Sequence, residues 1–374
     1  MKQKKVEKMV EMSQLHRMIW HIVMIGFVTF GARGVEVTSV INPLPGGPAP
    51  DPCVVYDGAT GYYYALNTNA GDDGFSATEL SIRRCRVAAL LRQGERKVLY
   101  VTNATDRVYN CIWAPEMHKA PDDRWYIWTS GAIDPECKHK RIIVFQSKTT
   151  DPFDGFVFKG HPDPNLDAID PTVTIFPDGR MYACISPYDE KQQWLRIREL
   201  ENPWTYGEKW ADIAFAELPW ERMPPHYHNW PIAEGPFFLR SPDGKRIFIV
   251  YSANGCWSDD YMLGLLEYQG GDPCRKEAWK KHPLPVFKKG NGVFGTGHAS
   301  FFMSPDGAET WIAYHSLERS DPEGKPLPRY MNIQKISFDA TGFPIFGDPV
   351  PHGQQMPPPS GEMGPNGGHS GRSK

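Results

Sequence analysis

The chain has 374 residues, with 41 Lys and Arg against 44 Asp and Glu, which gives a formal net charge of −3 and a pI near 6.5. No block of basic residues follows the first eight positions, so nucleic acid and anionic membranes are excluded as the main partners. Gly and Pro occur 35 times each and 13% of the residues are aromatic, a composition typical of many short strands joined by turns.

The first 34 residues have the pattern of an export signal. A start with four lysines precedes an apolar run from Met18 to Phe30, and the small-residue stretch Gly31–Gly34 follows. Such a run is too short to span a membrane as a helix, and no later segment is longer and equally apolar. We therefore expect residues 1–34 to be a signal peptide and the mature protein to be secreted or periplasmic, without a membrane partner. An amphipathic N-terminal helix is the alternative.

A hairpin-like segment recurs five times along the chain. Two runs of apolar or alternating residues surround a turn in each copy, as in DPTVTIFPDGRMYACISP. The copies begin 63, 56, 64 and 64 residues apart, at Asp51, Ala114, Asp170, Glu234 and His298. A unit of this length has room for four strands. The repeat predicts an all-β, five-bladed β-propeller.

The propeller is expected to occupy residues 35–351. Separate tandem domains are disfavoured, because one unit could not bury its own apolar faces and no Gly/Ser or Pro linker interrupts residues 45–350. A two-sheet sandwich is the alternative fold. Residues 352–374 are rich in Pro, Gly and Ser, so we expect a disordered tail there.

The seven cysteines show no CxxC pair and no zinc-ligand spacing. Most are expected to be free, buried thiols, although an oxidising compartment also permits one or two disulfides. No phosphate-binding glycine loop or nucleophile elbow is present either, and we expect no organic cofactor.

In a propeller the equivalent positions of the blades lie in a ring around the central axis. The repeat starts therefore bring Asp51, Asp170, Glu234 and His298 together at one mouth of the channel. One Asp-Pro start alone is explained by a turn or strand cap. Three carboxyl groups buried at matched positions are costly, and this convergence indicates a functional site.

Five motifs at the repeat starts resemble those of glycoside hydrolase family 43, and the resemblance covers about residues 45–350. In chain order they read APDPCVVYD, IWAPEMHK, AIDPTV, AEGPFF and GTGHASFF, and the segment MNIQKISFDATGFPIFGDPV resembles the family's closing strand. The resemblance implies a propeller that hydrolyses arabinose- or xylose-containing plant cell-wall oligosaccharides or polysaccharides with inversion at the anomeric carbon.

Three further stretches, SIRRCRVAALL, RWYIWTSG and YMLGLLEY, are most similar to the family's α-L-arabinofuranosidases, which trim arabinan from its ends. The expected activity is therefore release of L-arabinofuranose from arabinan or arabino-oligosaccharides. A β-D-xylosidase or an endo-arabinanase on the same propeller is the alternative enzyme. A carbohydrate-binding propeller is the non-enzymatic alternative, which predicts the loss of at least one ring acid.

The resemblance also implies catalytic roles. Inverting hydrolysis needs a carboxylate base that activates water and a carboxylic acid that protonates the leaving oxygen. Asp51 corresponds to the base, Glu234 to the acid, and Asp170 to the residue that orients the acid and tunes its pKa. A structural ion pair with an arginine is the alternative role of Asp170. Glu116 lies two positions from the ring and is expected to be structural or a distant sugar contact.

Three residues are candidates for substrate binding. Trp113 would form a wall of the sugar site or belong to the core, and Arg329 would bind sugar hydroxyls or an acid in the pocket. His298 matches a histidine that lies close to a calcium ion in the family, so it would be a ligand of a structural calcium or form hydrogen bonds in the channel. The chain departs from the family pattern at Ala299 and Cys53, which weakens the inference about the substrate.

Overall fold

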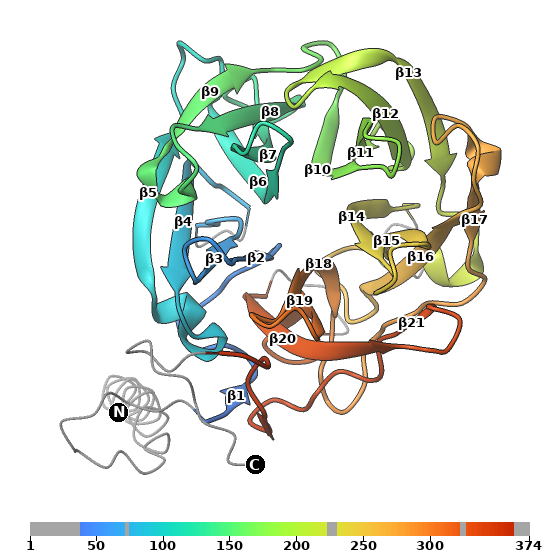
Figure 1. The fold of residues 1–374 in the computed structure, drawn as a ribbon. Helices are drawn as coiled ribbons and strands as arrows, with labels where there is room; N and C mark the ends of the chain where they lie inside the picture. The colour runs from blue at the N-terminus through green and yellow to red at the C-terminus, as the bar shows by residue number, and fades with distance from the viewer. Residues whose placement is uncertain (1–37, 72–74, 223–229, 322–326, 363–374) are drawn as a thin grey trace, which may run out of the picture.

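A computed structural model describes residues 38–71, 75–222, 230–321 and 327–362. The predicted signal peptide and residues 363–374 of the predicted tail lie outside these ranges. The chain forms five four-stranded sheets arranged radially around one axis (Figure 1), which confirms the predicted five-bladed, all-β propeller. Within the described ranges, no helix has the length and apolar character needed to cross a bilayer.

Each blade is formed by four strands that follow one another in the chain and pair antiparallel. The first blade comprises β2 (Cys53–Asp57), β3 (Tyr62–Leu66), β4 (Glu79–Cys85) and β5 (Glu95–Val101). The second comprises β6 (Asn110–Lys119), β7 (Trp125–Ala132), β8 (Lys140–Ser147) and β9 (Phe156–Gly160). The third comprises β10 (Ala168–Ile175), β11 (Met181–Pro187), β12 (Leu195–Asn202) and β13 (Thr205–Ala214). The fourth comprises β14 (Ala233–Arg240), β15 (Ile247–Ala253), β16 (Met262–Tyr268) and β17 (Trp279–Lys281). The fifth comprises β18 (Gly297–Met303), β19 (Thr310–Leu317), β20 (Arg329–Phe338) and β21 (Pro344–Ile345).

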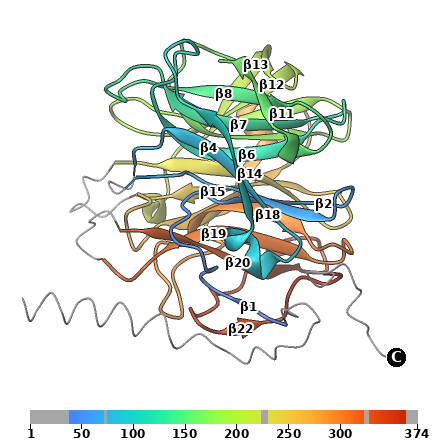
Figure 2. The same cartoon turned by 90° about the vertical axis from the view of Figure 1, so that its left-hand side faces the viewer.

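Short 3₁₀ turns and one extra strand pair complete the described structure. The turns are η1 (Ala88–Gln93), η2 (Pro152–Asp154), η3 (Pro219–Glu221) and η5 (Lys276–Ala278). The pair is formed by β1 (Val40–Ile41) and β22 (Gln355–Met356), which lie side by side at the edge of the fifth blade (Figure 2).

The blades are held together by large side chains packed between neighbouring sheets. Every residue of β7 is buried, whereas no residue of the outer strand β5 is fully buried. Tyr182 of the third blade and Tyr251 of the fourth belong to one buried cluster. Because aromatic side chains bury large apolar areas, the interfaces between blades supply the core that a single unit lacks.

The inner strands share an unusual backbone conformation at the predicted repeat starts. Asp51, Ala114, Asp170 and His298 have φ angles of 54°, 45°, 53° and 49°, and Gly235, beside Glu234, has 52°. Register shifts interrupt the pairing of β6, β10, β14 and β18 at these positions. A left-handed conformation costs a non-glycine residue about 1–3 kcal/mol and is concentrated at functional sites. The sequence repeat therefore corresponds to a ring of bulges around the axis.

The N-terminal segment closes the ring by pairing with the last blade. Asn42 donates through Nδ2 to the carbonyl of Ile333 at 2.8 Å and accepts the Ile333 N–H through Oδ1 at 3.0 Å. The N–H of Ala49 donates to the carbonyl of Arg329 at 2.8 Å. The segment before Asp51 and the start of β20 are thereby fixed to each other at the channel.

The prediction of a disordered tail from residue 352 onward was wrong for residues 352–362. Strand β22 pairs with β1, Met356 packs against the cluster that contains Ala88, and the Ala88 N–H donates to Oε1 of Glu362 at 3.0 Å. The composition gives little apolar surface to bury, but polar side chains and the backbone bind to groups that the propeller presents in fixed positions. The hydrogen bonds offset the entropy of ordering the segment.

Ending the chain after Pro351 is expected to lower the free energy of unfolding by about 2–4 kcal/mol, at about 1 kcal/mol for each net hydrogen bond lost. The lost bonds include those of the Ser360 hydroxyl to Asp306 at 2.7 Å and of its N–H to Glu309 at 3.0 Å. Urea denaturation measures the change. A chain ended after Glu362 keeps these contacts and serves as the control, and equal midpoints for the two would contradict the prediction.

All seven cysteines lie in the described ranges, and none forms a disulfide there. Four are buried, namely Cys53, Cys111, Cys184 and Cys274. This agrees with the prediction that most of the cysteines are free thiols.

Candidate active site

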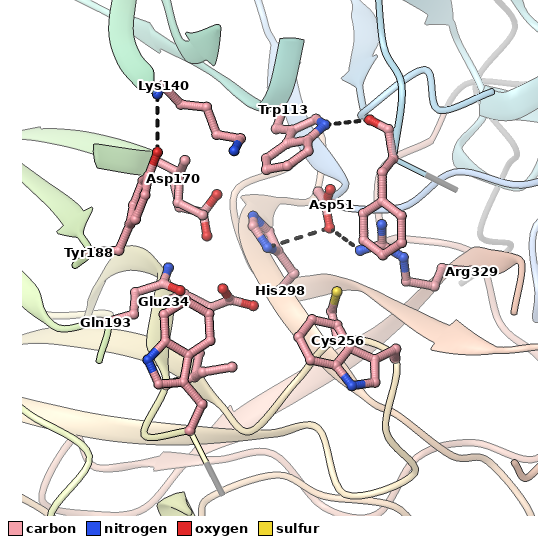
Figure 3. Close-up of a pocket in the computed structure, with 15 residues that line it drawn as sticks. Asp51, Trp113, Lys140, Asp170, Tyr188, Gln193, Glu234, Cys256, His298 and Arg329 are labelled. Carbon is pink, nitrogen blue, oxygen red and sulfur yellow. Dashed lines mark hydrogen bonds and ion pairs between the residues drawn. The ribbon is translucent and has the colours of Figure 1, made fainter. Parts of the chain in front are cut away.

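A cavity of about 250 Å³ lies at the centre of the propeller, where the inner strands begin (Figure 3). All six predicted site residues line it: Asp51, Trp113, Asp170, Glu234, His298 and Arg329. They come from all five blades, so groups separated by up to 278 residues share one pocket.

The backbone around Glu234 fits the pocket only because a glycine follows it. The N–H of Gly235 donates to Oδ2 of Asp170 at 3.0 Å. A Cβ at position 235 would lie 3.0 Å from Nδ1 of His298 and 3.2 Å from the Ser252 hydroxyl. The φ angle of Gly235, 52°, is also one that residues with a side chain rarely adopt. The glycine therefore allows blades three, four and five to approach one another directly behind the acid.

The carboxylate of Asp51 is buried beside an arginine, a threonine and two histidines. Arg329 Nη1 donates to Oδ1 at 2.8 Å, and the hydroxyl of Thr68 donates to Oδ2 at 2.7 Å. The Nδ1 atoms of His298 and His315 lie 3.5 and 3.3 Å from Oδ1. Burial favours the protonated form, but Arg329 and the two histidines outweigh it and hold the pKa of Asp51 well below 3.8.

The pKa of Glu234 is shifted in the opposite direction, upward. Burial and the negative charge of Asp51 raise its pKa from 4.5 to about 7, against the opposing effects of a hydrogen bond from Tyr261 and the charge of Arg329. At mildly acidic pH Asp51 is therefore ionised and Glu234 protonated. This is the pair of protonation states that general base and general acid catalysis requires.

Asp170 lies in the same pocket, between the inner strands of the second and fourth blades (Figure 3). Burial, followed by the charges of Glu234 and Asp51, raises its pKa well above 3.8. The hydrogen bond described for its carboxyl group comes from the backbone of Gly235 and not from an arginine. This geometry favours a role in orienting the neighbouring acid over a structural ion pair.

Trp113 forms one wall of the cavity. Its Nε1 donates to the carbonyl of Phe75 at 2.6 Å, and Nζ of Lys140 lies 4.9 Å from the ring centroid (Figure 3). The ring is thus fixed at one edge while a face is turned to the pocket, an arrangement that suits stacking of a sugar ring. Trp113 also packs against the buried cluster that contains Met117 and Ile127, so it contributes to the cavity wall and to the core.

The structure shows the protein contacts of Arg329 and Glu116. Arg329 forms an ion pair with Asp51, and binding an acid of the pocket is one of its two predicted roles. Glu116 does not line the cavity. It is buried, and Oε2 lies 2.8 Å from Nε2 of His118, so Glu116 is structural.

Sequence reasoning missed several residues that complete the pocket. These are contributed mainly by loops and strand ends, where the repeat leaves no signal: Lys140, Tyr188, Gln193, Cys256 and Trp257. The Lys140 N–H donates to the hydroxyl of Tyr188 at 3.0 Å, which joins the second and third blades at the rim. Thr68 was missed as well, although it follows the second strand of a recognised hairpin.

The calcium ion expected at His298 finds few ligands in this pocket. Calcium prefers six to eight oxygen atoms, whereas His298 presents Nδ1 to the Asp51 carboxylate. The described residues contain no group of three or more His, Cys, Asp or Glu side chains arranged to hold a metal ion. A calcium ion at His298 would therefore be bound largely by water, and it stays a prediction beside the alternative of hydrogen bonding in the channel.

Comparison with known proteins agrees with the fold and the pocket. Over 310 residues, which are 80% of this chain and 62% of the relative, the sequence is 28% identical to an extracellular exo-α-(1→5)-L-arabinofuranosidase of Streptomyces avermitilis. It is also 28% identical to α-L-arabinofuranosidase 43 of Humicola insolens over 305 residues, 78% of this chain and 60% of that protein. The chain thus spans about 60% of the length of these curated relatives.

The crystal structure of an α-L-arabinofuranosidase from Lactobacillus brevis superimposes with a TM-score of 0.74 and 26% identity, covering 84% of this chain and 98% of that one. The family model described as glycosyl hydrolases family 43 matches residues 40–344, which include the six pocket residues predicted from the sequence. This chain belongs to glycosyl hydrolases family 43.

Proposed function

We propose that this protein is an inverting glycoside hydrolase that releases L-arabinofuranose from the ends of arabinan or arabino-oligosaccharides of plant cell walls. The observation that carries the proposal is the pair of carboxyl groups, Asp51 and Glu234, held in one pocket with opposite shifts in pKa. The similarity to arabinofuranosidases supports the choice of sugar.

In the proposed reaction Asp51 accepts a proton from water as the water attacks the anomeric carbon, while Glu234 donates its proton to the leaving oxygen. Arg329 and Thr68 leave Asp51 ionised and fixed in position. Asp170 holds the backbone beside Glu234 and orients the acid. Each turnover ends with Asp51 protonated and Glu234 ionised, and exchange with water restores both groups.

The size of the cavity supports cleavage at chain ends. Its volume of about 250 Å³ is below the ~300–1,000 Å³ typical of sites for drug-sized ligands. Such a space suits a single sugar ring against the Trp113 face, whereas an endo-acting enzyme needs an open groove for several rings.

Parallel assays with nitrophenyl α-L-arabinofuranoside and nitrophenyl β-D-xyloside test the choice of sugar, and digestion of linear arabinan tests the mode of attack. We expect turnover of the arabinofuranoside and arabinose as the first product of arabinan. Preference for the xyloside, or early release of oligosaccharides, would instead identify a xylosidase or an endo-arabinanase. NMR of the first product formed should show the inverted anomer. Binding of oligosaccharides without any turnover would indicate a carbohydrate-binding propeller.

The rate is expected to fall as the pH rises through about 7. Glu234 acts in its protonated form, and its pKa is raised to about 7, so deprotonation removes the acid above that pH. The acidic limb of the rate profile lies well below pH 4, because Asp51 remains ionised as the pH falls to that range. A profile of kcat/KM on an arabino-oligosaccharide measures both limbs. A rate that increases between about pH 7 and 9 would contradict the assignment of the acid.

We also propose that the protein is exported by its N-terminal segment, as the basic start and apolar run indicate. Expression of the full chain in a bacterial host, followed by N-terminal sequencing of the periplasmic or secreted product, tests this. The expected new N-terminus lies near residue 35. Full-length protein retained in the cytoplasm would contradict it.

A further inference from the structure

Tyr261 touches the proposed acid although it does not line the cavity. It immediately precedes β16, is fully buried, and its hydroxyl donates to Oε1 of Glu234 at 2.8 Å. Burial, and then the charge of Glu234, raises the pKa of Tyr261 well above 10, so the phenol keeps its proton and remains a donor.

The ring of Tyr261 is also in contact with the surroundings of the base. It stacks on the imidazole of His315, with the ring centroids 5.2 Å apart and the planes at 4°. Nδ1 of His315 accepts the backbone N–H of Asp51 at 3.2 Å. Two stacked rings therefore connect the carboxyl group of the acid with the backbone of the base.

Neither ring has room to move. His315 is fully buried on β19, and burial lowers its pKa to about 4, so it is neutral. Gly297, at the start of β18 in the fifth blade, lies against Tyr261, and a Cβ there would lie 2.3 Å from Cδ1 of the tyrosine. The Tyr261 N–H is held by the carbonyl of Ser258 at 3.2 Å. The hydroxyl thus points at Glu234 from a fixed position.

We propose that Tyr261 is a positioning residue for the general acid, holding the catalytic proton of Glu234 on Oε2 by occupying Oε1. A carboxylic acid carries its proton on one oxygen, and the oxygen that accepts the phenol hydrogen bond is the carbonyl oxygen. The hydroxyl then belongs to Oε2 and is available to the leaving oxygen in the pocket. The inference rests on the proposed function, because it assigns a direction to the proton that Glu234 donates.

Tyr261→Phe tests the inference through its dependence on the leaving group. An arabino-oligosaccharide has a poor leaving group and needs a well-aimed acid, whereas dinitrophenyl α-L-arabinofuranoside departs without protonation. We expect kcat to fall about 10- to 100-fold on the oligosaccharide and less than about threefold on the dinitrophenyl substrate, with KM little changed. Equal losses on both substrates, or no loss on either, would overturn it.

Tyr314→Phe is the matched control. Tyr314 is also fully buried, and its hydroxyl is bonded to Gln334 Oε1 at 3.0 Å, away from the pocket. The control should show no difference between the two substrates, and a difference as large as that of Tyr261→Phe would overturn the inference. Gly297→Ala gives a second variant, in which the added methyl displaces the Tyr261 ring and should produce the same selective loss.

The pH profile gives an independent readout. The hydrogen bond from Tyr261 lowers the pKa of Glu234, so its removal should move the alkaline limb upward from about pH 7. The other charged or titratable groups facing Glu234 are unchanged in the variant: Asp51, Asp170, Cys256 and Arg329. An alkaline limb that stays at the same pH in Tyr261→Phe would overturn the inference but not the proposed function. A wild-type protein that is inactive on both substrates would overturn the inference and the proposed function together.

Discussion

Replacing Asp51 by Asn is expected to lower kcat about 10³- to 10⁴-fold on every arabinofuranoside, because the amide cannot accept a proton from the attacking water. The loss should not depend on the leaving group, since water must be activated whichever group departs. The substitution keeps an oxygen that accepts from Arg329 or Thr68, and we expect the stability loss to be about 2 kcal/mol, the order of one hydrogen bond to a charged group. Stopped assays with natural and nitrophenyl substrates measure the rates.

Asp57→Asn is the matched control for Asp51→Asn. Asp57 ends β2, the strand that begins two residues after Asp51, is equally buried, and accepts hydrogen bonds from Thr60 at the turn instead of facing the cavity. Its variant should retain the wild-type rate. More than a tenth of wild-type activity in Asp51→Asn, with thermal unfolding showing an intact fold, would rule out Asp51 as the base.

Glu234→Gln is expected to lower kcat about 10³- to 10⁴-fold on arabino-oligosaccharides and less than about tenfold on the dinitrophenyl substrate. Glutamine retains an oxygen that accepts the Tyr261 hydroxyl, so the pocket keeps its shape, but it has no acidic proton to donate. The alkaline limb near pH 7 should be absent from the residual activity on arabino-oligosaccharides, because the group that titrates there has been removed.

Glu116→Gln controls for the loss of a buried glutamate. Burial raises the pKa of Glu116 well above 4.5, as it does for Glu234, yet Glu116 is bonded to His118 and lies outside the cavity. It should retain both activity and the alkaline limb. If Glu234→Gln lost activity equally on both substrates, its role as a proton donor would be refuted.

The positions of the predicted acids could be found without coordinates because they recur. Asp51, Asp170, Glu234 and His298 stand at the starts of equivalent hairpins, and rotational symmetry brings equivalent positions to one axis. Arg329 came from the family resemblance and Trp113 from its aromatic ring beside the second repeat start, and both line the cavity. The left-handed residue at or beside each repeat start leaves no readable pattern in the sequence, since four of the five are not the Gly or Asn that this conformation favours.

Other residues of the pocket could not be predicted from the sequence. Lys140, Cys256 and Trp257 lie at strand ends or in loops that differ from blade to blade, so no periodicity marks them. Tyr261 and His315 look like ordinary apolar or aromatic positions within strand patterns. The tail was misjudged for a related reason: composition predicts how much apolar surface a segment can bury, but not whether a neighbouring blade presents partners such as the Ala88 N–H.

The amino-acid sequence by itself determined the strand count, the repeat and the residue types at the axis, because each depends on local pattern and spacing. Only the tertiary structure decided which carboxyl group is ionised. Asp51 and Glu234 are both buried acids, and their pKa values separate because Arg329 binds one while the other faces the resulting negative charge. Burial and Coulomb interactions depend on distances between blades, and no one-dimensional pattern contains those distances.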